Sequence, residues 1–323
     1  MVTTVKIEIT PLEYELALRC AWLSKVQENT LLEIAQQLNL STAKVHRLIV
    51  HAEHKGLLKT WITGYPDECV AMSERIKQKF NLLNCHVVPD KDLAFETNAI
   101  DVVGYAAAQI LFEWLVENPS GFIGVGKGRS IKSTVAALPL IQCPNVSFIA
   151  VSGSLTNNYA IVKEDVIHEL VQKTHGKGYL LPHPHFAIDE VKRREILSQE
   201  PIQALHELTK QAQKIIIGIG NTTEQPFVRR AKLIDDNKWQ EIIDKGAVAE
   251  CLGSFLDING NIVSAKEHEL FMGLDLNELK GLKVLAVVGG KNKGYATLAT
   301  LRTDVITDLV LGESSAKVVL ENI

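Results

Sequence analysis

The spacing of apolar residues divides the chain into two regions of different character. From residue 11 to about residue 60, apolar positions recur with the period of a helix, and glycine is absent until Gly56. From about residue 84 onward, β-rich apolar runs end in glycine clusters and alternate with amphipathic stretches, which is typical of a parallel α/β sheet. The turn signal Gly64-Tyr65-Pro66 lies between them. We therefore predict a small all-α domain over residues 1–62, a connecting helix over 63–83 and an α/β domain over 84–323.

The first region is predicted to hold three short helices. The first begins at Pro11, which suits the first helical position, and Thr30 with Glu33 forms a capping box for the second. A tight turn requires a residue in the left-handed backbone conformation, and Asn39 adopts this conformation at low energetic cost. Ser41 can cap the third helix. Two short helices joined by such a turn form a helix-turn-helix. The predicted buried face of the third helix consists of Val45, Leu48, Ile49 and Ala52.

The outward face of the third predicted helix is suited to contact DNA. The second helix of a helix-turn-helix can enter the major groove, where hydroxyl groups bind phosphate and basic side chains meet phosphate or guanine. Residues 56–62 have strand character and are predicted to form the wing of a winged module. The alternative is a plain three-helix bundle that serves only protein assembly. The candidate DNA-binding residues are Ser41, Thr42, Lys44, His46, Arg47 and Lys59.

Glycine and hydroxyl residues follow four predicted strands of the second region. The run 122–125 leads into Gly126-Lys127-Gly128-Arg129-Ser130 and then into a helix, an arrangement that presents free amides to an anion. Similar loops follow the apolar runs 146–151, 214–217 and 282–288. Because ligands of open α/β sheets sit beyond the carboxyl ends of the strands, these loops are expected to converge on one crevice that binds a small phosphorylated, hydroxyl-rich molecule. The alternative for the first loop is a tight turn with solvated Lys and Arg side chains.

These segments together resemble one family of proteins. Residues 31–59, LLEIAQQLNLSTAKVHRLIVHAEHKGLLK, resemble the winged helix-turn-helix of the SorC family of bacterial transcription regulators, and nearly all of the remaining chain is similar to that family's sugar-binding domain. The resemblance implies an α/β effector domain with a parallel-rich sheet and flanking helices, similar to sugar-phosphate isomerases, which binds a phosphorylated sugar. The family's motifs correspond to Gly124–Ser130, Tyr179–Pro184, Gly218–Gly220, Gly246–Cys251, Phe255–Gly260 and Gly289–Lys293.

The resemblance also implies roles for individual residues. Arg129 and the amides of residues 126–130 are expected to hold phosphate, Lys293 to add charge, and Glu250 with the 182–185 loop to bind sugar hydroxyls. Glu250 stands where the family usually has aspartate, which leaves the identity of the sugar open. In the loop, His183 and His185 are expected to point the same way, with one of them contacting the ligand. The predicted effector-binding residues are Gly126, Lys127, Gly128, Arg129, Ser130, Gly153, Ser154, His183, Gly220, Asn221, Glu250 and Lys293.

Composition limits the possible functions further. The 323 residues are 46% hydrophobic and 22% charged, which are ordinary values for a globular protein. The net charge of −4 gives no global positive field, so DNA contact has to come from a local patch. Five scattered cysteines without a CxxC pair are expected to be reduced and buried. We expect no metal, no cofactor, no membrane span and a cytoplasmic location.

The sequence therefore favours a DNA-binding transcription regulator that responds to a sugar phosphate, acting as a homodimer or homotetramer on a palindromic operator. The main alternative is an enzyme related to sugar-phosphate isomerases and deaminases, with a helical N-terminal appendage. Aminosugar-phosphate deaminases carry catalytic groups after a GIG motif, whereas here Gly218-Ile219-Gly220 is followed by Asn221-Thr222-Thr223. No catalytic residue is assigned. A Schiff base on Lys127 or Lys293 remains open as a way of holding the ligand.

Overall fold

A computed structural model describes residues 10–323, apart from residues 91–95, 157–159, 161, 224–226 and 264. The chain divides into two compact units, residues 1–62 and residues 63–323. Each unit has its own hydrophobic core, so we describe each by itself.

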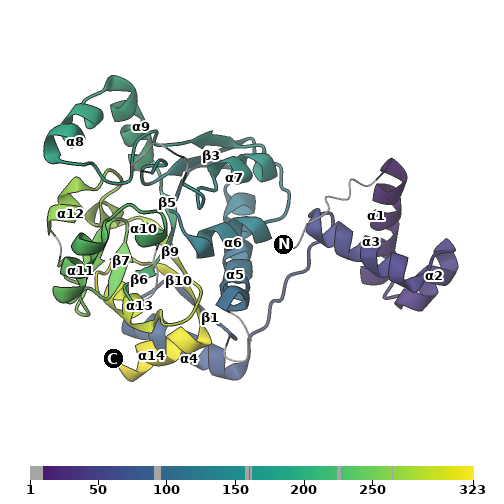
Figure 1. The fold of residues 1–323 in the computed structure, drawn as a ribbon. Helices are drawn as coiled ribbons and strands as arrows, with labels where there is room; N and C mark the ends of the chain where they lie inside the picture. Colours follow the sequence, from purple (N-terminus) through teal and green to yellow (C-terminus); the bar gives the residue numbers. More distant parts are fainter. Residues whose placement is uncertain (1–9, 91–95, 157–159, 161, 224–226, 264) are drawn as a thin grey trace. The chain divides into compact units, whose positions relative to one another are not determined.

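In the first unit, residues 10–62 form three helices: α1 (Pro11–Lys25), α2 (Leu31–Leu38) and α3 (Thr42–His54) (Figure 1). The predicted capping box is present at the start of α2, where the amide of Thr30 donates to Glu33 Oε2 over 2.7 Å. Asn39 has a φ of 57° and ends α2 in the left-handed conformation, and Ser41 Oγ accepts from the amide of Lys44 over 3.2 Å. The core between the helices includes Ala17, Cys20, Ile34, Val45, Leu48, Ile49 and Ala52.

The strand predicted over residues 56–62 is not present. These residues form turns, bends and irregular backbone, and Leu57 and Leu58 pack against the core of the three helices. A strand is stable only when its backbone groups pair with a neighbouring strand, and residues 10–62 contain no other strand. The apolar residues that suggested a wing therefore serve the helical core.

The second unit is built on a seven-stranded sheet whose neighbouring strands are all parallel. In spatial order the strands are β1 (Asn84–Val88), β10 (Asp308–Gly312), β9 (Lys283–Val288), β5 (Lys214–Gly218), β2 (Ser120–Val125), β3 (Asn145–Ala150) and β4 (Lys177–Tyr179). The four strands that the sequence pattern predicted are β2, β3, β5 and β9, and they are consecutive neighbours in the sheet. The expected α/β architecture with a parallel-rich sheet is therefore confirmed.

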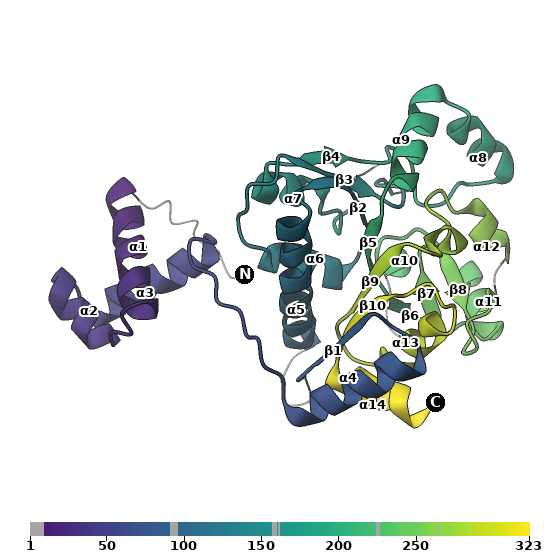
Figure 2. The ribbon, with the colours of Figure 1, turned by 180° about the vertical axis from the view of Figure 1, so that it is seen from behind.

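Helices cover both faces of this sheet (Figures 1 and 2). On one face, α5 (Glu96–Glu117), α6 (Arg129–Ala137) and α7 (Ile167–Thr174) pack against alternate strand residues such as Leu285 and Val287. On the other face, α4 (Asp67–Lys79), α13 (Gly294–Leu301) and α14 (Glu313–Glu321) belong to the core that includes Val284 and Ala286. Because successive side chains of a strand point to opposite faces, a continuous apolar run is what a doubly covered strand requires.

A small antiparallel sheet and several short helices complete the second unit. The strand β6 follows β5 after one residue and pairs with β7, which in turn pairs with β8. This sheet therefore stands next to the carboxyl end of β5. The bounds of these elements are β6 (Gly220–Asn221), β7 (Ala249–Cys251), β8 (Ser254–Leu256), α8 (Glu190–Leu197), α9 (Glu200–Lys210), α10 (Phe227–Arg230), α11 (Asp236–Asp244), α12 (Ala265–Leu270) and a 3₁₀ helix at Leu276–Leu279.

The segment predicted as a separate connecting helix belongs to the second unit. Cys69, Met72 and Ile76 of α4 are buried in the core on one face of the sheet, and α4 packs against β1 and α14. The apolar face of α4 thus has a partner within the chain, which explains why residues 63–83 are not an independent linker.

The helix α5 is long and apolar enough, by length and composition, to cross a membrane. More than half of its apolar stretch is buried inside the second unit, where Val103, Ala107 and Leu111 contact the core of the sheet. A helix in the centre of a folded domain has the same composition, so the packing accounts for its apolar character.

Candidate functional site

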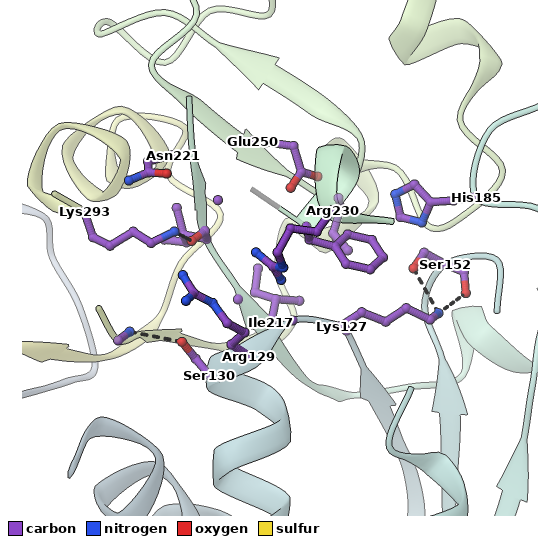
Figure 3. A pocket seen from close by; sticks show the side chains of 18 residues that line it. Lys127, Arg129, Ser130, Ser152, His185, Ile217, Asn221, Arg230, Glu250 and Lys293 are labelled. Atoms are coloured by element: carbon purple, nitrogen blue, oxygen red, sulfur yellow. Dashed lines mark hydrogen bonds between the residues drawn. The ribbon is translucent and has the colours of Figure 1, made fainter. Parts of the chain in front are cut away.

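A pocket lies where the loops after β2, β5 and β9 meet, at the carboxyl ends of these strands (Figure 3). Of the twelve effector-binding residues predicted from the sequence, all except Gly153, Ser154 and His183 line it. The convergence follows from the strand order, because β9, β5 and β2 are neighbours. The volume open to the centres of water molecules is about 60 Å³, which is room for a few of them.

The loop between β2 and α6 has the geometry of an anion site. Gly128 has a φ of 124°, a backbone conformation that glycine adopts more easily than other residues. It directly precedes Arg129, the first residue of α6. Among the described residues, no side chain caps the N-terminus of α6 at Gly128. The hydroxyl of Ser130 accepts from the amide of Gly289 over 3.1 Å, which fixes this loop against the loop after β9. Helix N-terminal amides therefore face a pocket whose walls are held together by hydrogen bonds.

Lysine and arginine side chains enter the pocket from several elements. Lys293, at the N-terminus of α13, is 8% exposed, and its Nζ donates to the carbonyl of Ile219 over 2.9 Å. Arg129 and Arg230 both extend their guanidinium groups into the pocket (Figure 3). Arg230 also binds Glu164, with Nη2 and Oε1 separated by 3.1 Å. These cations give the pocket a positive lining suited to phosphate.

Arg230 was not predicted from the sequence. It lies on α10, a helix of four residues, which is too short to show a helical period. The only available signal was the basic pair Arg229-Arg230 close to the loop after β5. The position of Arg230 in the pocket is seen only in the structure.

Lys127 is the most deeply buried cation of the pocket. Its side chain is 3% exposed, and its Nζ donates to the carbonyl of Ser152 over 2.7 Å and lies 3.7 Å from Asp165 Oδ2. Burial lowers the pKa of Lys127 to about 8, although the neighbouring Asp165 carboxylate opposes the shift. Protein oxygens therefore surround the ammonium group. The alternative that this loop is a turn with solvated side chains is wrong for Lys127.

Glu250 reaches the pocket from β7. Its Oε1 accepts from the amide of Gly253 over 3.0 Å. Burial raises the pKa of this carboxyl, while that hydrogen bond and the charge of Lys293 act in the opposite direction. Gly220 lies directly beside it, since a Cβ added there would be 2.9 Å from Glu250 Oε2. Close backbone approach at Gly220 therefore lets the carboxylate reach the pocket.

The two histidines of the 182–185 loop do not point the same way, contrary to the prediction. His185 lines the pocket, whereas His183 does not. His183 Nε2 is 3.1 Å from His206 Nε2 of α9, its Nδ1 is 3.0 Å from the carbonyl of Pro184, and the two imidazole rings stack. The prediction assumed an extended loop with side chains on one side, but backbone hydrogen bonds and the partner on α9 turn His183 away.

Gly153 and Ser154 also lie outside the pocket, and Ser152 takes their place. The amide of Ser154 donates to the carbonyl of Leu181 over 2.9 Å, so this segment runs along the 181–184 loop. A Cβ on Gly153 would overlap the carbonyl oxygens of that loop. Close packing between two backbone segments, rather than ligand binding, explains the glycine.

The candidate DNA-binding residues lie on the solvent side of the first unit. Ser41, Thr42, His46 and Arg47 are exposed, at the start of α3 and on its outer face. Lys44 is half-buried, with its Nζ 4.0 Å from Glu13 Oε1 of α1. Lys59 lies beyond α3 with its Nζ 5.3 Å from the centre of the Trp61 ring. The outer face of α3 is therefore accessible, and Lys44 is half-buried beside α1.

The cysteines are free and buried, as predicted. Within the part of the chain that the structure describes, no group of three His, Cys, Asp or Glu side chains could hold a metal ion.

The chain is similar to known regulators along most of its length. It is 29% identical over 305 residues to the erythritol catabolism regulatory protein EryD of Brucella abortus (strain 2308), covering 94% of this chain and 96% of that protein. It is 27% identical over 315 residues to the transcriptional regulator LsrR of Enterobacter sp. (strain 638), covering 95% and 93%. The predicted resemblance to this group of regulators is thereby confirmed.

Solved structures show the same fold. The full-length sorbitol operon regulator SorC from Klebsiella pneumoniae matches with a TM-score of 0.71 at 19% identity, covering 95% of this chain and 99% of that one. A DeoR family transcriptional regulator from Listeria monocytogenes matches with a TM-score of 0.70 at 20% identity, covering 78% and 100%. The family described as "Putative sugar-binding domain" matches residues 66–321. Since this match spans almost the whole second unit and most of the chain, the protein belongs to the sugar-binding domain family.

Proposed function

We propose that the protein is a DNA-binding transcription regulator of a carbohydrate-utilisation operon, and that a phosphorylated sugar or sugar alcohol controls its affinity for operator DNA. The observation that carries the proposal is the pocket, where a helix N-terminus, basic side chains and a buried carboxylate meet in a sugar-binding family member. Relatives named for erythritol catabolism and for the sorbitol operon support a polyol or sugar as the effector class.

The phosphate of the effector binds at the Gly126–Ser130 loop. Amides of the first turn of α6 donate to its oxygens, and the planar guanidinium of Arg129 can donate two parallel hydrogen bonds. Lys293 adds charge from the opposite wall. Sugar hydroxyls donate to the Glu250 carboxylate and to the side-chain oxygen of Asn221, whose Nδ2 is already engaged with the carbonyl of Asn292 over 3.0 Å.

DNA is bound by the helix-turn-helix that α2 and α3 form. Ser41 and Thr42 at the start of α3 bind phosphate, while His46 and Arg47 reach base edges in the major groove. Lys44 and Lys59 add phosphate contacts. Because the chain as a whole is negatively charged, two or four copies acting together on a palindromic operator supply the affinity.

The two sites communicate through the arrangement of subunits. The effector changes operator affinity only if it binds one arrangement better than another, and by linkage the operator changes effector affinity by the same factor. We propose no catalytic role, because the loop after β5 carries Asn221-Thr222-Thr223 where deaminases have catalytic groups. We place the protein in the cytoplasm, where its operator and effector are found.

The test is DNA binding by the purified full-length protein to the segment upstream of its own gene. Binding is followed by fluorescence anisotropy at two salt concentrations, with inorganic phosphate, polyol phosphates, sugar phosphates and the corresponding free sugars. Binding that weakens steeply with salt and changes with one phosphorylated compound, but not with its free sugar, supports the proposal. Absence of binding to any genomic fragment, together with turnover of a panel member, favours the enzyme instead.

A further inference from the structure

His185 is a buried polar side chain that the phosphate site does not use. It is 3% exposed and lines the pocket, yet neither ring nitrogen has a hydrogen-bond partner among the described residues. A buried group left unsatisfied in this way destabilises the folded state. A partner supplied by a bound ligand would remove that cost, so the unpaired nitrogens mark a place where a polar ligand atom fits.

The surroundings hold the ring in a fixed orientation. Phe186, Phe227 and Phe271 contact it edge-on, with ring centres 4.8, 5.5 and 5.0 Å away. Burial and the nearby Lys127 charge keep the pKa of His185 well below its usual value, so the ring is neutral. A neutral imidazole offers one donor and one acceptor, which matches a hydroxyl group and does not attract an anion.

Charge is distributed unevenly across the pocket. In Figure 3, Arg129, Ser130 and Lys293 lie on one side, and Lys127, Ser152 and His185 lie on the other. On the His185 side, Lys127 Nζ lies 3.7 Å from Asp165 Oδ2. Arg230, whose guanidinium extends toward the middle of the pocket, has its Nη2 3.1 Å from Glu164 Oε1. A second phosphate there would compete with these carboxylates, whereas an uncharged oxygen would not.

We propose that His185 is a specificity-determining residue that hydrogen-bonds an uncharged hydroxyl or carbonyl oxygen at the end of the effector away from its phosphate. The effector is accordingly a monophosphate with a polar, neutral far end. The inference rests on the proposed function, because it takes the phosphate to bind at the α6 loop. Beyond the proposed function, the inference gives the orientation of the effector in the pocket. It also names His185 as the residue that distinguishes a hydroxylated far end from an apolar or anionic one.

The experiment measures dissociation constants of the full-length protein by isothermal titration calorimetry. The probes are inorganic phosphate, sn-glycerol 3-phosphate, D-erythritol 4-phosphate and D-sorbitol 6-phosphate. For each variant we define the far-end gain as the dissociation constant of inorganic phosphate divided by that of the tightest polyol phosphate. The 1-deoxy analogue and the bisphosphate of that polyol complete the set.

The variants are His185→Leu, His185→Gln and a matched control, His183→Gln. Leucine suits the aromatic surroundings of residue 185 and removes both polar atoms, so we expect the far-end gain to fall about tenfold. Glutamine keeps a donor and an acceptor and is expected to retain most of the gain. The control changes the neighbouring buried histidine, which bonds His206 outside the pocket, and leaves the gain as in the wild type. If His185→Leu lacks a cooperative melting transition, His185→Phe replaces it.

Each outcome decides the question. A gain that falls in the apolar variant and is also lost with the 1-deoxy analogue supports the role of His185. An unchanged gain in that variant, an equal loss in the control, no gain with any polyol phosphate, or tighter binding of the bisphosphate overturns it. Failure of inorganic phosphate and of every probe to bind overturns the proposed phosphate site as well, whereas phosphate binding without any far-end gain overturns only this inference.

Discussion

The two units present their candidate sites in opposite ways. The first unit displays a row of exposed side chains on one helix of thirteen residues, so a single element holds most of the site. The second unit encloses a pocket whose residues come from loops as far apart in sequence as Lys127, His185 and Lys293. A site on one helix depends on that helix alone, whereas a site between loops depends on the order of the strands.

The two sites also differ in whether a substitution that changes binding is expected to change the unfolding free energy as well. Arg47 is exposed, so its replacement is expected to alter DNA contact with little effect on folding. In the pocket, Lys127 and Ser130 each make a hydrogen bond to another loop, and Glu250 makes one to the turn that follows its own strand, so these bonds also hold the pocket together. Substitutions there are expected to change ligand affinity and unfolding free energy together.

Reversing the charge of Arg47 is the strongest way to break the first site alone. We expect Arg47→Glu to weaken operator binding about 100-fold, because a dimer of the kind we propose would lose a base or phosphate contact from each of its two subunits, at about tenfold per contact. Effector affinity in the absence of DNA stays as in the wild type. Fluorescence anisotropy with operator DNA and calorimetry with the effector give the two values.

The matched control for this change is Arg19→Glu. Arg19 is an exposed residue of α1 whose Nη2 lies 3.7 Å from Glu15 Oε2, so its reversal changes the charge of the same unit by the same amount. Equal losses in the two variants would mean that overall charge, rather than the outer face of α3, governs DNA binding.

Removing Arg129 is the corresponding change in the second site. A hydrogen bond to a charged phosphate is worth more than one between neutral groups, so we expect Arg129→Ala to weaken effector binding about 30-fold. Operator affinity without effector is expected to remain within twofold of wild type. The control is Lys132→Ala, which removes an exposed charge from the same helix. A similar loss with Lys132→Ala would contradict a specific role for Arg129.

The sequence predicted much of this pocket because parallel strands end at one edge of a sheet. Apolar runs followed by glycines located β2, β5 and β9, and their ends supply Arg129, Asn221 and Lys293. The sequence pattern indicated that these strands are buried on both faces and parallel. Their position as neighbours, which brings the three loops together, is seen only in the structure.

The rest of the pocket depends on contacts that no local pattern carries. His183 and His185 are two residues apart in one loop, and backbone hydrogen bonds together with His206 on α9 turn the first of them away. Similarly, the apolar residues 56–62 have strand character, but Leu57 and Leu58 find their partners in the helical core. Propensity describes a segment, whereas side-chain direction is decided by what packs against it.

Filling the space at Gly220 tests how closely the pocket is packed. A Cβ there would lie 2.9 Å from Glu250 Oε2, so Gly220→Ala has to push the carboxylate aside. We expect effector affinity to fall about fivefold and unfolding free energy to fall by about 1 kcal/mol. Gly64→Ala is the control, because a Cβ at Gly64 meets no atom within 4 Å. Equal effects of the two changes would show that Glu250 is not held by close contact with Gly220.

The smallest expected effect concerns the buried ammonium of Lys127, whose pKa is lowered to about 8 by burial. In the unfolded chain a lysine has a pKa of about 10.4, so between these values the unfolded state binds more protons than the folded state. The unfolding free energy therefore rises with pH in that window, by about 1 kcal/mol between pH 8 and pH 9, and this rise is absent from Lys127→Met. Urea unfolding of both proteins at pH 7, 8 and 9 measures the difference in slope, which is unaffected by any constant loss of packing in the variant. Parallel pH profiles for the two proteins would mean that the folded protein does not lower the pKa of Lys127, and the difference between the exposed site and the buried site would then not extend to this residue.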